Sequence, residues 1–91
     1  MIDLTTYPLY PFEMITQNEC IFCDRAKALL KSKGVAFNEC SIDDPQLGSL
    51  WRAKLRASGL KTVPQIFMYN QDTQEYDLIG GFTDLERYFN G

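Results

Sequence analysis

Residues 12–42 read FEMITQNECIFCDRAKALLKSKGVAFNECSI and contain the patterns of a strand, a helix and a second strand. The run Phe12–Thr16 is apolar enough for a strand inside a sheet. A helix is indicated next by small and apolar residues at i, i+3 and i+7, namely Cys23, Ala26 and Leu30. Gly34 supplies a left-handed stop, and Val35–Ile42 predicts the second strand. A strand, helix and strand of this length form a βαβ unit with a right-handed crossover.

The rest of the chain predicts two more helices and two more strands. Asp43-Asp44-Pro45 offers a carboxylate cap and an early proline, and the helix that follows ends at Gly59. Val63–Tyr69 and Tyr76–Ile79 are strand candidates, and the polar residues 70–75 between them suit an antiparallel hairpin. A capping-box pattern, Thr83 and Glu86, then opens a last helix. Its side chains expected to face inward are Leu85, Tyr88 and Phe89.

The resulting order, β-α-β-α-β-β-α, predicts an α/β fold. We expect a four-stranded mixed sheet flanked by three helices. The 91 residues suit one domain: residues 1–10 read as an irregular N-terminal lead-in and residues 11–91 as a single domain.

Composition and charge exclude several classes of function. The nine Lys and Arg residues are scattered along a chain of net charge −3, so no nucleic-acid partner is expected. The longest uncharged stretch, residues 62–71, is too short to span a bilayer, so no membrane association is expected. The first residues lack the basic start and apolar run of a signal peptide, which favours a cytoplasmic location.

The pair Cys20 and Cys23 is the most informative motif. Residues three apart on a helical turn have Cα atoms about 5 Å apart, and a disulfide requires about 4.4–6.8 Å. If the helix begins at Cys20, unpaired backbone N–H groups and the helix dipole favour the thiolate and lower its pKa from about 8.5. We therefore expect Cys20 to be the nucleophile and the more buried Cys23 to be the resolving thiol.

Other interpretations of the cysteines remain open. The pair could fill the core, because free cysteine packs as a small apolar residue. A zinc site would need carboxylates, because the chain has no His and only one further thiol, Cys40; we expect no metal. Cys40 is either a packed core residue or a regulatory or glutathionylated thiol. Lys27, one turn beyond Cys23, either adds positive potential there or is solvated surface.

Three separated segments together resemble the glutaredoxin family. Residues 18–30 are similar to its active-site loop and first helix, residues 62–67 (TVPQIF) to its T-V-P segment, and residues 79–85 (IGGFTDL) to its G-G-x-x-D turn. Their order and spacing also agree, so the resemblance covers about residues 12–90. It is nearest to bacterial dithiol glutaredoxins and also fits phage-encoded ones.

The resemblance implies a thioredoxin-like fold with Pro64 in cis beside Cys20. It also implies that glutathione binds as co-substrate, with the Val63 backbone pairing its cysteinyl part and the turn at Gly81 holding its γ-glutamyl end. The glutathione contacts that it implies are Gln17, Phe22, Thr62, Val63, Pro64, Gly81, Phe82, Thr83 and Asp84. Taken alone, Val63-Pro64 also fits the start of an edge strand, and Thr83 and Asp84 also fit a helix cap.

The chain departs from the family at two places. Ile21-Phe22 stands between the cysteines where the family commonly has Pro-Tyr, which keeps an aromatic ring and loses its hydroxyl. Gln17 stands where a Lys often pairs with the glycyl carboxylate of glutathione, so the charge-assisted contact is lost, although an amide can still donate a hydrogen bond. Arg52 and Lys61 are the candidates to replace that contact.

The expected function is a glutathione-dependent thiol–disulfide oxidoreductase that reduces protein disulfides and glutathione mixed disulfides. We also expect a monomer, and the resemblance implies ribonucleotide reductase as one candidate client. Two alternatives stay open. One is an iron–sulfur cluster carrier, in which two subunits each supply Cys20 and a glutathione. The other is a redoxin reduced by thioredoxin reductase.

Overall fold

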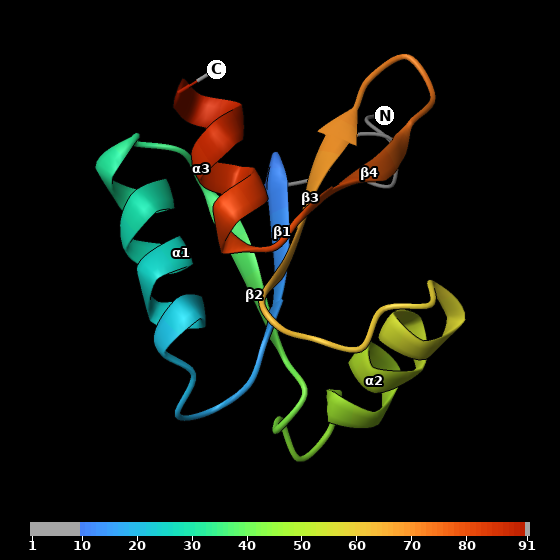
Figure 1. The fold of residues 1–91 in the computed structure, drawn as a ribbon. Coiled ribbons are helices and arrows are strands. Elements are labelled where there is room, and N and C mark those ends of the chain that lie inside the picture. Colours follow the sequence, from blue (N-terminus) through green and yellow to red (C-terminus); the bar gives the residue numbers. More distant parts are fainter. Residues whose placement is uncertain (1–9, 91) are drawn as a thin grey trace, which may run out of the picture.

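The computed structural model describes residues 10–90, which form a four-stranded sheet of order β2-β1-β3-β4 and three helices (Figure 1). The strands are β1 (Phe12–Thr16), β2 (Phe37–Ser41), β3 (Gln65–Asn70) and β4 (Glu75–Gly80). The helices are α1 (Ile21–Ser32), α2 (Gly48–Ala57) and α3 (Phe82–Asn90). β1 pairs with β2 in parallel and with β3 antiparallel, and β4 pairs with β3 antiparallel. The expected fold class is confirmed; most of the expected lead-in, residues 1–9, lies outside the described residues.

The helices cover the two faces of the sheet. In Figure 1, α1 and α3 lie together on one face and α2 lies on the other. Side chains of β1 alternate between the two cores, as the pleat of a strand requires. Met14 packs with Ala26 and Leu30 under α1 and α3, whereas Ile15 packs with Leu55 under α2.

β1 has the predicted bounds, and each end of the other strands differs from the prediction by one or two residues. β2 is shorter than the expected Val35–Ile42, and β3 begins at Gln65 rather than at Val63. α2 begins at Gly48, because the carboxylate of Asp44 caps a preceding turn instead of the helix itself. Its Oδ1 accepts the backbone N–H groups of residues 46 and 47 at 2.7 and 2.8 Å, and these bonds lower the pKa of Asp44.

The predicted cap of the last helix is wrong. α3 begins at Phe82, so the cap lies upstream of the expected Thr83–Glu86 pair. The backbone N–H of Gly81 donates to Asp84 Oδ2 at 3.0 Å, and an acidic side chain at the third helical position thus reaches back to the residue before the helix. Leu85 is fully buried as expected. Tyr88 is 47% exposed, and its ring packs edge-on against the buried Phe12 with ring centres 6.3 Å apart, so it faces inward only in part.

None of the helices in residues 10–90 is both long and apolar enough to cross a membrane.

Candidate active site

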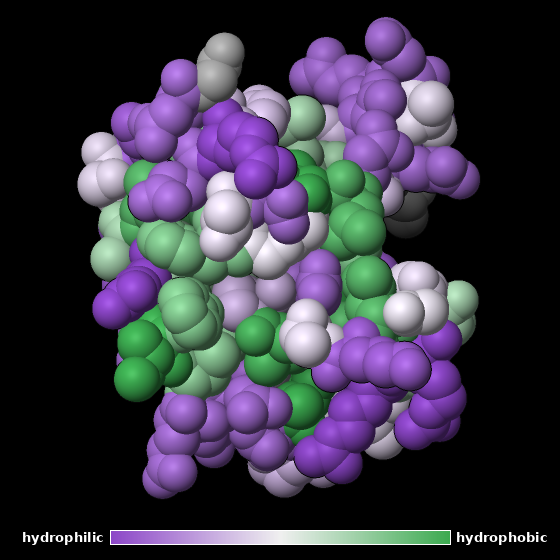
Figure 2. Space-filling view, viewed as in Figure 1, coloured by the Kyte–Doolittle hydropathy of each residue, from purple (hydrophilic) through white to green (hydrophobic). Residues whose placement is uncertain are grey.

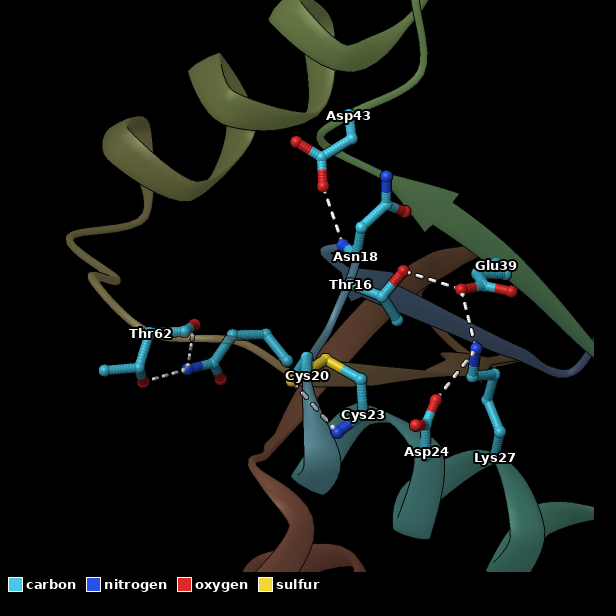
Figure 3. Close-up of a disulfide and its surroundings, with 10 residues drawn as sticks. Thr16, Asn18, Cys20, Cys23, Asp24, Lys27, Glu39, Asp43 and Thr62 are labelled. Atoms are coloured by element: carbon cyan, nitrogen blue, oxygen red, sulfur yellow. Dashed lines mark hydrogen bonds and ion pairs between the residues drawn. A yellow bond between two sulfur atoms is a disulfide. The ribbon is translucent and has the colours of Figure 1, made fainter.

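The cysteine pair lies at the N-terminal end of α1 as a disulfide (Figure 3). The two Cα atoms are 5.1 Å apart, within the range that a disulfide accepts. Cys20 is the N-cap of the helix, with extended backbone, and its Sγ accepts the backbone N–H of Cys23 at 3.1 Å. Oxygen side chains usually take this position. Here a sulfur atom occupies it and faces the positive end of the helix dipole.

The two cysteines differ in access to solvent. Cys20 is partly exposed, whereas Cys23 is 1% exposed and packed in the core. A large attacking or leaving group can therefore reach Cys20, but Cys23 can react only with a sulfur held at Cys20.

A carboxylate in the connection between β2 and α2 holds the loop that leads into Cys20. The backbone N–H of Asn18 donates to Asp43 Oδ2 at 2.6 Å, and Figure 3 shows Asp43 pointing at this loop from the approach to α2. The other oxygen of Asp43 lies 3.8 Å from Arg52 Nη2. Glu19, between Asn18 and Cys20, has a left-handed backbone with φ of 55°. No local sequence pattern links residues 18 and 43, so this role of Asp43 is visible only in the folded chain.

A groove of about 240 Å³ lies beside the cysteine pair. It is lined by Phe22, Thr62, Val63, Pro64, Gly81, Phe82, Thr83 and Asp84. These are eight of the nine residues that the resemblance implied as glutathione contacts. Gln17 is exposed and does not line it.

Two features give this groove its recognition chemistry. The Val63–Pro64 peptide bond is cis, as the resemblance implied. Within residues 10–90, neither the backbone N–H nor the carbonyl of Val63 has a hydrogen-bond partner, so both remain available to a ligand. The rings of Phe22 and Phe82 lie 6.2 Å apart and join the N-terminal ends of α1 and α3.

Asp84 serves both the helix and the groove. Its Oδ2 accepts the N–H of Gly81, while Oδ1 lies 3.5 Å from Arg87 Nη1, and its side chain remains 49% exposed. The capping and binding interpretations of this residue are therefore compatible in geometry.

An ion-pair network lies on the α1 face of the sheet (Figure 3). It includes two residues of α1 that follow Cys23, Asp24 and Lys27. Glu39 Oε2 accepts from the Thr16 hydroxyl at 2.8 Å and from Lys27 Nζ at 3.2 Å. Lys27 also pairs with Asp24 at 3.5 Å. Burial alone lowers the pKa of Lys27, but the bonds and charges of Glu39 and Asp24 outweigh it, so the pKa is raised. Lys27 is thus an ion-paired residue with a side chain 27% exposed, and not freely solvated surface.

Cys40 is a buried free thiol in the core beneath α2. Burial raises its pKa to about 11, with further contributions from the negative charges of Glu13 and Glu39 that Lys54 partly offsets. These properties agree with the packed-residue interpretation. Among residues 10–90, no cluster of three or more His, Cys, Asp or Glu side chains is arranged to hold a metal ion.

Comparisons with known proteins agree with this geometry. A sequence model of the glutaredoxin family matches residues 12–72. Glutaredoxin 3 of Escherichia coli K12 is 45% identical over 73 residues, which are 80% of this chain and 78% of that protein. The glutaredoxin of Pseudomonas aeruginosa is 45% identical over 77 residues, covering 82% of this chain and 80% of that protein.

Solved structures show the same fold. Glutaredoxin 1 from Francisella tularensis, complexed with cacodylate, is 33% identical with a TM-score of 0.65, covering 87% of this chain and 91% of that one. The buckwheat glutaredoxin–glutathione complex is 25% identical with a TM-score of 0.70, covering 90% of this chain and 71% of that one.

Proposed function

This chain belongs to the glutaredoxin family and is a thiol–disulfide oxidoreductase, and on that basis we propose that glutathione is its reducing co-substrate. Its substrates are protein disulfides and mixed disulfides between proteins and glutathione. Cys20 is the nucleophile, and Cys23 is the resolving thiol.

The reaction cycle has two halves, reduction of the substrate and regeneration of the enzyme by glutathione. Each half consists of two thiol–disulfide exchanges. The Cys20 thiolate attacks one sulfur of the substrate disulfide, forming a mixed disulfide and releasing the first substrate thiol. Cys23 loses its proton and attacks Cys20 Sγ, which forms the intramolecular disulfide and releases the second thiol. Two glutathione molecules then return both cysteines to thiols and leave as glutathione disulfide, so two electrons pass from glutathione to the substrate.

The observation that carries the proposal is the position of Cys20 beside the groove. A sulfur that caps a helix receives backbone N–H groups that stabilise its negative charge. Phe22, two residues further along, lines the groove. A reactive sulfur and a ligand groove are therefore adjacent.

The groove matches the parts of glutathione. The free backbone groups of Val63 suit an extended cysteinyl residue, which would pair with them as a short β-strand. The helix end at Gly81 suits the γ-glutamyl carboxylate, and Asp84 suits its ammonium group. The buckwheat relative was solved in complex with glutathione, which supports this assignment.

The direct test uses single cysteine variants with a glutathione mixed disulfide as substrate. Cys20→Ser should lose measurable activity, whereas Cys23→Ser should retain part of it, because a second glutathione can resolve the mixed disulfide at Cys20. Cys40→Ala is the matched control and should keep activity close to that of the parent chain. Full activity in Cys20→Ser would refute the assignment. Equal activity with thioredoxin reductase in place of glutathione would refute the choice of reductant.

We propose further that the chain acts as a monomer in the cytoplasm, with ribonucleotide reductase among its candidate clients. Size-exclusion chromatography of the reduced chain with glutathione tests the monomer, and a visible chromophore with dimerisation after anaerobic iron and sulfide treatment would favour the cluster-carrier alternative instead.

A further inference from the structure

The charges of this chain are divided unevenly along its length. Residues 45–71 contain four of the nine basic residues and none of the twelve acidic ones. Residues 25–38 contain another four basic residues and no acidic one, so a chain of net charge −3 has two positive segments. The segment at residues 45–71 comprises α2, the connection from it to the groove, and β3. Figure 2 shows strongly hydrophilic surface where α2 lies, at the lower right.

The fold turns part of this segment toward the active site. Arg52 and Arg56 are one helical turn apart and so lie on the same flank of α2. Arg52 reaches Asp43, which itself binds the loop before Cys20, and this places the flank beside that loop. Lys61 follows the helix and directly precedes Thr62, a lining residue of the groove. We call Arg52, Arg56 and Lys61 the basic flank.

Lys54, the fourth basic residue of the segment, does not belong to the basic flank. Its Nζ lies 3.3 Å from Glu13 Oε1 and 4.5 Å from the centre of the Phe67 ring, so its charge is used within the fold.

The basic flank is largely without neutralising partners. Arg56 and Lys61 are exposed and form no ion pair within residues 10–90. Arg52 is 55% exposed and its single carboxylate contact is long, at 3.8 Å. Like charges at i and i+4 weaken a helix slightly. The last-turn position favours Arg56 through the helix dipole, but Arg52 in the second turn has no such benefit.

We propose that the basic flank is a docking surface for acidic polypeptide segments next to the disulfide of a protein substrate. The proposal rests on the proposed function, because it describes how a protein reaches Cys20. A client with Asp or Glu near its cysteine places those carboxylates against Arg52, Arg56 and Lys61 while its sulfur meets Cys20. Complementary charge raises the rate of encounter and orients the client.

The arrangement favours a polypeptide over a nucleic acid. Three exposed cations suit a few carboxylates, whereas a phosphate backbone requires a longer basic surface, and the chain outside residues 45–71 carries twelve acidic residues against five basic ones. Weak, salt-sensitive binding suits a reductase that must release each client after exchange.

The test uses short peptides that carry one cysteine as a mixed disulfide with glutathione and differ only in flanking residues: Glu, Ser or Lys. The measured quantity is the ratio of kcat/KM for the Glu peptide to that for the Ser peptide. Any effect on glutathione turnover that is common to both peptides cancels in this ratio. For the parent chain we expect a ratio of about ten at low ionic strength that falls toward one in high salt.

Matched variants locate the effect. Arg56→Gln with Lys61→Gln should lower the ratio to about two or less, because only the docking charges change. Lys31→Gln with Lys33→Gln removes the same charge at the far end of α1 and should leave the ratio unchanged. Thermal unfolding of both double variants checks that each remains folded.

Several outcomes would overturn the proposal. It is wrong if the parent chain treats the Glu and Ser peptides alike at low salt, or if the two double variants lower the ratio equally. It is also wrong if the Arg56 and Lys61 changes raise the KM for glutathione and leave the ratio intact, because these cations would then serve glutathione. Binding of single-stranded DNA that the same changes abolish would favour a nucleic-acid surface. Failure of the parent chain to reduce even the Ser peptide with glutathione would instead refute the proposed function.

Discussion

At the scale of single residues, the chain separates three thiols into three environments. Cys20 caps a helix and is partly exposed, Cys23 is buried one turn further on, and Cys40 is buried under α2. Helix-end donors stabilise a thiolate, and burial without such donors opposes one. We therefore expect Cys20 to be the most reactive of the three thiols and Cys40 to be the least reactive.

Alkylation of the reduced chain tests this separation. Cys20 should react with iodoacetamide with an apparent pKa at least about one unit below the reference value near 8.5. Cys40 should stay unmodified at neutral pH, because its pKa is about 11 and it is 2% exposed. Mass spectrometry after peptide digestion assigns the sites, and a Cys20 pKa of 8.5 or higher would contradict the proposed thiolate.

Asp84 offers a second residue-scale prediction. Asp84→Ala removes both the acceptor for the Gly81 N–H and the carboxylate in the groove. We expect the KM for glutathione to rise several-fold and the free energy of unfolding to fall by about 1 kcal/mol. Asp84→Asn should keep most of the cap but lose the charge. A large change in stability without any change in KM would mean that Asp84 only caps α3.

At the scale of elements, the active site depends on a contact between two connections. The loop from β1 to α1 is held by Asp43, which lies in the connection from β2 to α2. These connections are adjacent because β1 and β2 are parallel neighbours and end at the same edge of the sheet.

Variants of Asp43 distinguish positioning from charge. Asp43→Ala should loosen the loop before Cys20, raise the Cys20 pKa and lower kcat/KM about threefold to tenfold, since a hydrogen bond to a charged group contributes about 1.5–3 kcal/mol at most. Asp43→Asn retains an acceptor for the Asn18 N–H and should stay near the parent in both quantities.

The control is Asp72→Asn, which removes the same charge in the β3–β4 hairpin. Identical pKa shifts in Asp43→Ala and Asp43→Asn would show that the carboxylate acts on Cys20 through its charge alone.

At the scale of the whole molecule, two cores on either side of one sheet hold the elements in place. The core between the sheet and α1 with α3 includes the fully buried Met14, Leu30, Ile66 and Leu85. The core under α2 includes Cys40 and is bordered by the ionisable groups Glu13 and Lys54. Stability should therefore depend on pH through the α2 side.

The direction of this pH dependence follows from Cys40. Its pKa rises from 9.0 to about 11 in the folded state, so the unfolded chain loses this proton first as pH increases. The contribution of the protonated Cys40 to the free energy of unfolding is therefore fully present below pH 9 and is lost between pH 9 and 11. The pKa of Lys27 is also raised, so the stability that its ion pairs contribute is lost as the pH rises above the ordinary lysine value of 10.5.

Urea unfolding of the oxidised chain at pH 7, 9 and 11 measures this loss. Cys40→Ala should be less stable than the parent at pH 7 because of the cavity, yet should lose less stability on going to pH 11. A parallel fall of the parent and the variant over this range would contradict the burial of Cys40.

The sequence by itself determined the local features of this protein. Apolar periodicity, Gly34 and the spacing of Cys20 and Cys23 predicted the elements and the redox pair, because these depend on side chains a few residues apart. Element ends were less accurate: Asp44 capped a turn rather than α2, and Asp84 rather than Thr83 with Glu86 capped the last helix.

Only the tertiary structure decided which distant residues meet. It brought Asp43 to the loop of Asn18, joined Lys27 to Glu39, and set Arg52 against Asp43, which places this part of the basic flank beside that loop. The linear sequence shows that residues 45–71 carry basic residues and no acidic one, but it does not show that Arg52 lies beside the loop before Cys20. The physical reason is that such contacts depend on strand order, crossover direction and the rotation of each helix about its axis, and these are fixed by packing of the two cores rather than by any local pattern.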